Sequence, residues 1–213
     1  MIALIRKVLP LVIVPAALIP MCAAQTVERI GAATASNLPE AARQGVETKG
    51  YRVSLPGGTT DFWFAKNLAT TKKEAAGALY PELSDGEFVG IVNFAQAFTD
   101  FRGQNVPAGS YTLRYQLLPQ DGNHLGVSPN PDFLLAIPVA SDANPEQNYP
   151  YRRLVALSAK STGGSHPAVI AMETAGEPGT ATKTDAGTVF SVAIPTASGT
   201  RQIGICLTCS ASQ

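Results

Sequence analysis

Short runs of alternating apolar and polar residues are the feature that most constrains the fold of this chain. The clearest run covers residues 111–117 (YTLRYQL), where tyrosine and leucine alternate with threonine, arginine and glutamine. A period of two places the tyrosines and leucines on one face of a β-strand and the polar side chains on the other. Residues 107–109 (PAG) precede the run and are typical of a turn, because proline fixes φ and glycine tolerates positive φ. The run therefore predicts a half-buried strand.

Further runs of the same kind recur along the chain, and most are separated by glycine or proline. They cover residues 51–55, 61–66, 88–98, 133–139, 169–172, 189–194 and 203–207. The run at 133–139 is continuously apolar, which predicts a strand buried on both faces or covered by a helix. About eight strands with turns between them favour an antiparallel β-sandwich over alternating strands and helices. We therefore expect a mainly β fold, an immunoglobulin- or transthyretin-like sandwich with one or two short helices.

Helical patterns are scarce. Residues 38–44 are suited to two helical turns after Asn37, and residues 71–79 form a weaker candidate because Gly77 interrupts them. Residues 152–160 are the best candidate, and the glycines at 163 and 164 predict its end.

The residues between these elements define the expected domain organisation. Residues 25–49 are expected to form a flexible N-terminal arm with a short helix, followed by a single sandwich domain over residues 50–213. Within that domain, residues 174–187 are rich in glycine, threonine, alanine and proline and predict a long mobile loop or hairpin tip.

The first 24 residues have the pattern of a secretory signal peptide. Arg6 and Lys7 are followed by an uncharged, mostly aliphatic stretch over residues 8–20, and residues 21–24 (MCAA) end in small side chains. This pattern predicts an exported protein, periplasmic or secreted. A retained membrane anchor is the alternative, but the prolines at 10, 15 and 20 each remove a backbone donor and disfavour a spanning helix. Lipidation of Cys22 is a further alternative. Met21 disfavours it, because lipoprotein processing normally needs a small residue just before the cysteine.

Charge excludes two classes of partner. The full chain has 16 Lys plus Arg and 16 Asp plus Glu, and cleavage of the leader would remove two of the cations. A small negative net charge gives no basis for electrostatic capture of nucleic acid. The chain also lacks a polybasic tract for an acidic membrane surface, and no stable membrane span is expected after cleavage.

The two histidines suggest a metal site. His124 and His166 both lie in turn-like segments, and Asp121 and Asp132 flank the first of them. Imidazole nitrogens and carboxylate oxygens suit zinc, copper or another divalent cation. The alternative is that both histidines cap turns or face solvent, since their spacing matches no known ligand motif. Calcium ligation and ordinary Asx turns are competing interpretations of residues 121–132, and Asx turns are favoured.

The cysteine pair near the C-terminus predicts a disulfide. Cys206 and Cys209 form a C-x-x-C pattern, but too few residues follow for the helix that redox-active pairs require. In an extended strand their Cα atoms would lie about 10 Å apart, beyond the roughly 7 Å limit for bridging. We therefore expect Cys209 to lie in a turn and to close a small disulfide loop, with free thiols as the alternative.

Trp63, the only tryptophan, has two interpretations. It is expected in the core, where a sandwich commonly buries one indole. The alternative is an exposed platform, beside Tyr80, Tyr149 or Tyr151, for a sugar or peptide. No G-x-S-x-G, P-loop or H-E-x-x-H motif occurs in the sequence, and we assign no catalytic residue.

Three segments together resemble a group of uncharacterised exported proteins of Acidobacteria-like bacteria. The segments are residues 107–115 (PAGSYTLRY), 121–135 (DGNHLGVSPNPDFLL) and 165–169 (SHPAV). The resemblance covers about half of the mature chain and implies an exported β-sandwich with no assigned chemistry. The leading functional hypothesis is a non-enzymatic binding or accessory module of the bacterial envelope, with an envelope protein or a glycan as partner. The alternatives are a metal-binding or metal-dependent protein using His124 and His166, and a carbohydrate-binding surface around Trp63.

Overall fold

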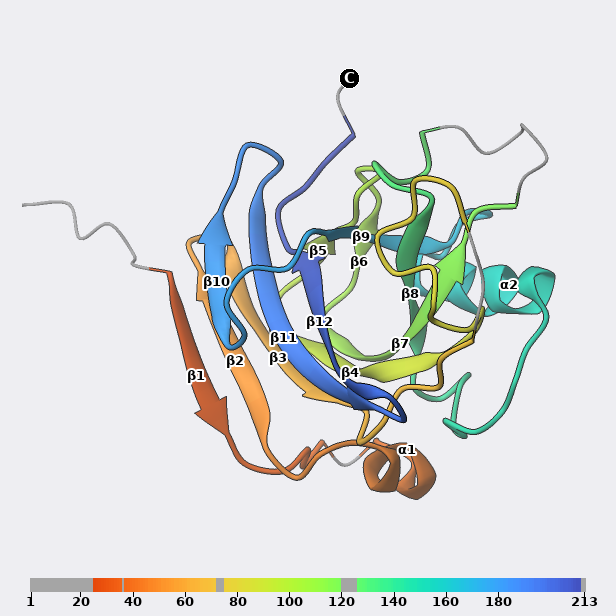
Figure 1. The fold of residues 1–213 in the computed structure, drawn as a ribbon, viewed down its shortest axis with the longest axis horizontal. Helices are drawn as coiled ribbons and strands as arrows, with labels where there is room; N and C mark the ends of the chain where they lie inside the picture. The colour runs from red at the N-terminus through yellow and green to blue at the C-terminus, as the bar shows by residue number, and fades with distance from the viewer. Residues whose placement is uncertain (1–24, 36, 72–74, 120–125, 212–213) are drawn as a thin grey trace, which may run out of the picture.

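The computed structural model describes residues 25–35, 37–71, 75–119 and 126–211. Within these residues the chain is mainly β, with twelve strands and two helices (Figure 1). The strands are β1 (Thr26–Ile30), β2 (Gly50–Leu55), β3 (Gly58–Phe64), β4 (Phe88–Phe94), β5 (Phe98–Thr99), β6 (Asn105–Val106), β7 (Gly109–Leu117), β8 (Asp132–Pro138), β9 (Ala168–Glu173), β10 (Thr180–Lys183), β11 (Thr188–Thr196) and β12 (Gly199–Cys206). The helices are α1 (Glu40–Gly45) and α2 (Tyr151–Thr162).

Ten strands form one antiparallel sheet in the order β1-β2-β3-β4-β7-β8-β9-β12-β11-β10, and β5 and β6 form a separate pair. The sheet turns at β9: its first four residues pair with β8, whereas Met172 and Glu173 pair with β12. The two ends of the sheet then meet. Strands β1 and β10 lie side by side, and the side-chain amide of Gln25 donates a hydrogen bond to the carbonyl of Ala181. The result is a sheet that is nearly closed into a barrel.

The structure confirms a mainly β, antiparallel protein, but it does not confirm the immunoglobulin- or transthyretin-like sandwich. Two separate sheets were expected, and one continuous sheet is present. The reason is that an alternating pattern identifies the inward face of each strand but not where a sheet is interrupted. Here β9 pairs on both sides, so the chain passes from one layer to the other without a break.

The interior of the sheet is filled by aromatic side chains. Phe62 of β3 lies 5.3 Å from Phe190 of β11 between ring centroids, and Tyr51 of β2 lies 5.4 Å from the same ring. These contacts join strands that are far apart in the sheet order, so the two ends of the sheet pack face to face. The predicted apolar face of β7 also points inward, since Leu113 and Tyr115 are fully buried in this core.

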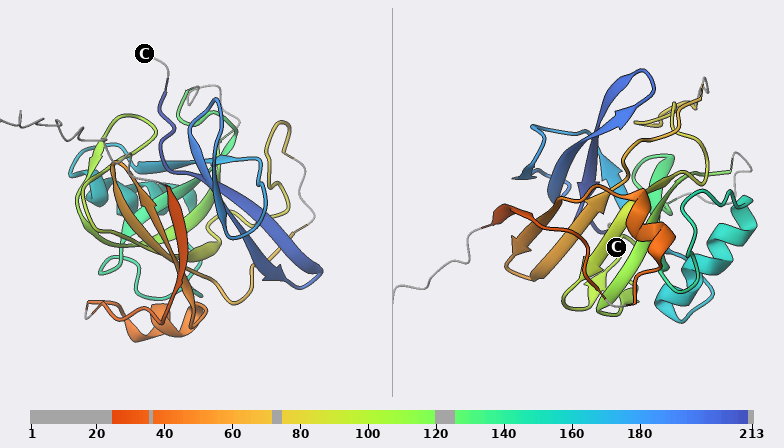
Figure 2. Two further views of the ribbon diagram at one scale, coloured as in Figure 1. Left: turned by 90° about the vertical axis from the view of Figure 1, so that its left-hand side faces the viewer. Right: turned by 90° about the horizontal axis from the view of Figure 1, so that it is seen from below.

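A second core lies on the outer face of β8 and β9, where α2 covers the sheet (Figure 2). Leu154 and Leu157 of α2 are buried with Phe133 and Leu135 of β8. The continuous apolar run at 133–139 is therefore buried on both faces and covered by a helix, as predicted. The helix ends before Gly163, which adopts a left-handed conformation with φ of 67°.

Three sequence expectations need correction. The N-terminal arm is not wholly flexible, because residues 26–30 form β1 and pair along their whole length with β2. The loop or hairpin tip expected at 174–187 is a tip only at residues 184–187, because residues 180–183 form β10, which pairs with β11. The helix expected at 71–79 is not seen in the described part of that segment, where residues 75–78 form a hydrogen-bonded turn. In each case backbone pairing or tertiary contact outweighs weak local propensity.

The described helices include none long and apolar enough to cross a membrane. Residues 1–24, which carry the predicted signal peptide and Cys22, lie outside the described residues.

Candidate ligand-binding pocket

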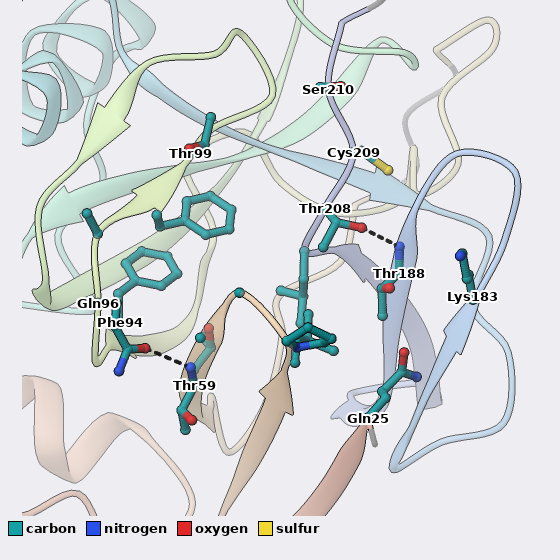
Figure 3. A pocket seen from close by; sticks show the side chains of 18 residues that line it. Gln25, Thr59, Phe94, Gln96, Thr99, Lys183, Thr188, Thr208, Cys209 and Ser210 are labelled. Atoms are coloured by element: carbon teal, nitrogen blue, oxygen red, sulfur yellow. Dashed lines mark hydrogen bonds between the residues drawn. The ribbon is translucent and has the colours of Figure 1, made fainter. Parts of the chain in front are cut away.

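A cavity of about 600 Å³ opens at one end of the nearly closed sheet, and we call it the mouth pocket (Figure 3). Segments distant in sequence form its walls: the β2–β3 turn, residues 96–99 after β4, the adjoining ends of β10 and β11, and residues 207–210 after β12. Its apolar lining residues are Leu55, Pro56, Phe94, Phe98 and Leu207, and its main polar ones are Gln25, Thr59, Thr60, Gln96, Thr188 and Thr208.

The alternation of the strands explains why both kinds of side chain meet there. Side chains two residues apart lie on the same face of a strand, and directly paired residues of neighbouring strands share a face. Ala181 pairs with Phe190, whose ring lies in the core, and Lys183 pairs with Thr188. Lys183 and Thr188 therefore continue the inward-facing rows of β10 and β11 to the mouth. Both residues line the pocket, with Thr188 buried and Lys183 exposed.

The apolar side of the pocket is continuous with the core. Phe94 is 2% exposed and belongs to the inner cluster, and Phe98 stacks on it with ring centroids 4.5 Å apart. Leu207 is also buried in that cluster, beyond the end of β12. A ligand in the mouth pocket would therefore contact apolar surface while its polar groups faced the rim.

Two hydrogen bonds order the polar side chains of the pocket (Figure 3). The Gln96 Oε1 atom accepts from the backbone N–H of Thr59 at 2.9 Å, and Thr208 Oγ1 accepts from the backbone N–H of Thr188 at 2.8 Å. Both side chains can still donate a hydrogen bond to a ligand, Gln96 through its amide N–H and Thr208 through its hydroxyl hydrogen. Among the described residues that line the pocket, Lys183 is the one with a charged side chain, and none is Asp or Glu.

The C-terminal wall of the pocket contains the predicted disulfide. Cys206 and Cys209 are at disulfide distance with their Cα atoms 5.6 Å apart, which confirms that Cys209 lies in a turn. The wall is also held by a hydrogen bond from the Leu207 N–H to the Thr188 carbonyl at 2.8 Å. Gly187 packs directly against this loop: a Cβ atom there would lie 3.0 Å from the Cys206 sulfur.

The candidate metal ligands are not brought together among the described residues. His124 and Asp121 lie outside the described part of the chain. His166 is exposed in the turn after α2, where its carbonyl accepts from the Thr162 hydroxyl at 2.8 Å. The described segments contain no group of three or more His, Cys, Asp or Glu placed to hold a metal ion. The metal hypothesis therefore stays a prediction that depends on His124.

Asp132, the fourth candidate ligand, has a structural role. It is fully buried, and its carboxylate accepts the backbone N–H of Leu79 at 3.1 Å and of Tyr80 at 2.8 Å. The Tyr115 hydroxyl donates to the Tyr80 carbonyl at 2.8 Å, and burial raises the pKa of that phenol. Both Asp132 oxygens thus tie the segment around residue 80 to the sheet, which a carboxylate does when buried among donors.

Trp63 is in the core rather than on an exposed platform. It is 8% exposed, and its indole N–H donates to the Gly31 carbonyl at 2.8 Å. Tyr80, one of its proposed neighbours on a platform, is 3% exposed. The structure confirms the expected core position of Trp63. Its buried ring is not available as a stacking surface for a glycan.

Sequence reasoning missed a buried ion pair on the outer face of the sheet. Arg114 of β7 was expected on a solvent-facing side of its strand, yet it is 1% exposed. Its guanidinium pairs with Asp142, which is 0% exposed, at 2.7 Å. The sequence gives no signal for the burial of Arg114, because residues 139–150, which cover its side of the strand, form no helix or strand. All five N–H groups of Arg114 have acceptors, which is typical of structural pairs.

Comparison with known proteins gives no relative for this chain: no protein-family model, no curated protein and no solved structure matches it. The mouth pocket is therefore interpreted from its own geometry.

Proposed function

We propose that this protein is an exported, non-enzymatic binding module of the bacterial envelope that holds a small ligand in the mouth pocket. The observation that carries the proposal is the pocket itself, with apolar side chains continuous with the core and a few polar groups at the rim. Pockets of about 300–1,000 Å³ with this composition are typical of small-molecule sites, and the mouths of β-barrels are among their preferred positions.

Two features support the remaining parts of the proposal. Disulfides persist in oxidising compartments, so the Cys206–Cys209 pair is compatible with export to the periplasm or beyond. The pocket lining offers hydroxyl, amide and ammonium groups that can form hydrogen bonds with the polar groups of a ligand. A partner protein or glycan of the envelope would be the source of the ligand or its recipient.

The proposal is tested with an uncharged fluorescent probe, N-phenyl-1-naphthylamine, titrated into the mature protein. We expect one saturable site with enhanced emission, because the probe leaves water for an apolar cavity. Thr99→Trp at the rim and Thr60→Trp at the inner wall should each reduce binding, since both residues line the pocket. Thr99 is exposed, so its replacement does not threaten folding.

The matched control is Thr200→Trp. Thr200 is exposed in the β11–β12 hairpin, at the opposite end of the sheet from the mouth. Absence of saturable binding to the wild type would contradict the proposed function. Binding that survives both filling variants, or that Thr200→Trp reduces equally, would also contradict it.

A further inference from the structure

We infer that the ligand of the mouth pocket is a small organic anion with an apolar body, and that Lys183 receives its negative group. This inference rests on the proposed function and names the ligand class for the same site. Lys183 lies on the inward-facing row of β10, two residues after Ala181, which packs against the inner core. Lys183 is exposed at the end of this row, so its stem can follow the apolar wall while its ammonium stays at the rim of the pocket.

The charges around the pocket favour an anion. Lys183 lines the pocket, and the lining residues that the structure describes include no Asp or Glu. The arginine ion pairs of the described residues, made by Arg43, Arg52, Arg114 and Arg201, involve side chains outside the pocket lining. An ammonium group at the edge of an apolar cavity attracts an anion more strongly than one in open solvent, because part of the surrounding water is excluded.

The pocket is polar on one side and apolar on the other. In Figure 3 Lys183, Thr188 and Thr208 lie on one side of the cavity, and Phe94 lies across it. The Thr208 hydroxyl accepts from the Thr188 N–H, which leaves its hydrogen free to donate to a ligand. An ammonium and neighbouring hydroxyl donors suit a carboxylate, and the stacked rings of Phe94 and Phe98 suit a ring or an alkyl chain.

The experiment compares two isosteric competitors that differ in charge. 1-Naphthylacetate and 1-naphthylacetamide are each used at pH 7.4 to displace N-phenyl-1-naphthylamine from the mature protein. The acid should displace the probe at about a five- to tenfold lower concentration, as expected for one partly exposed charge-assisted contact. Added salt should reduce that preference, because it screens the ion pair.

Substitutions assign the preference to one side chain. Lys183→Gln should remove the difference between acid and amide, and Lys183→Arg should retain it because the positive charge remains. Lys66→Gln makes the same charge change at an exposed site after β3, at the other end of the strand from the pocket, and should leave the preference intact.

The outcomes separate the two proposals. Equal displacement by acid and amide in the wild type, with probe binding still lost in Thr99→Trp, would overturn the anion inference and leave the proposed function standing. A preference for the acid that persists in Lys183→Gln would also overturn it. Failure of the probe itself to bind would contradict the proposed function, and the inference with it.

Discussion

Removal of the buried carboxylate of Asp142 is the sharpest test of how the outer face of the sheet is stabilised. Asp142 receives two hydrogen bonds from Arg114, from Nε at 2.8 Å and from Nη2 at 2.7 Å. The other guanidinium N–H groups donate to the carbonyls of Gly86, Asn144 and Pro145. The pair therefore fastens residues 142–145 to β7 in a site without solvent.

The expected cost follows from what each substitution leaves behind. Asp142→Ala leaves the guanidinium buried without its counter-ion, which typically costs about 3–5 kcal/mol. The Thr112 hydroxyl, which donates to Asp142 at 2.7 Å, also loses this bond and keeps the longer one to the Ile137 carbonyl at 3.4 Å, for up to about 1 kcal/mol more. The double variant Arg114→Met, Asp142→Leu removes both charges, so it should cost much less than the two single variants together.

The assay is urea unfolding followed by circular dichroism. It compares the wild type, Asp142→Ala, the single variants Arg114→Met and Asp142→Leu, and the double variant that combines these two. Asp185→Asn, which changes an exposed carboxylate, is the matched control and should stay within about 0.5 kcal/mol of the wild type. A loss below about 1 kcal/mol in Asp142→Ala would contradict the expected cost of a desolvated and unpaired guanidinium. Additive costs in the double variant would refute the reasoning too.

Three further predictions concern titration, the disulfide and metal. Burial raises the pKa of Glu87, so the folded state disfavours its charged form. At pH 7 the variant Glu87→Gln should therefore be more stable than the wild type by less than about 1 kcal/mol. This gain should vanish as pH falls through the raised pKa of the folded state towards 4.5, which unfolding curves from pH 7 to 4 would measure. A gain that is constant over that range would contradict the assignment. Replacing Cys206 and Cys209 by serine should lower the free energy of unfolding by about 2 kcal/mol for so short a loop. It should also weaken probe binding, because the disulfide holds the C-terminal wall of the pocket. Unchanged probe binding would contradict this role of the disulfide. Elemental analysis should find no stoichiometric zinc or copper, whereas one equivalent that is lost in the double variant His124→Ala, His166→Ala would favour the metal alternative.

The sequence predicted those parts of the fold that depend on local pattern. The alternation at 111–117 correctly placed Leu113 and Tyr115 in the core, and the apolar run at 133–139 correctly predicted a strand covered on both faces. The glycine after α2 and the cysteine pair at 206 and 209 were also interpreted correctly. Each of these features is set by a few neighbouring residues, so one window of sequence contains the whole signal.

The parts that could not be predicted depend on contacts between distant segments. Residues 26–30 and 180–183 have weak strand patterns and become strands because neighbouring β2 and β11 offer them a pairing edge. The burial of Arg114 depends on Asp142, which lies in an irregular segment. The mouth pocket is assembled from strand ends and turns spread along almost the whole chain, and no motif within the sequence marks it.

The most direct test of the binding pocket is a map of where a ligand contacts the protein in solution. Backbone amide resonances of the ¹⁵N-labelled mature protein are recorded with and without N-phenyl-1-naphthylamine. We expect the shifts to concentrate at Thr59, Lys183, Thr188 and Thr208 around the mouth, with residues of α2 unchanged. Shifts centred on α2 or spread evenly over the sheet would contradict this expectation.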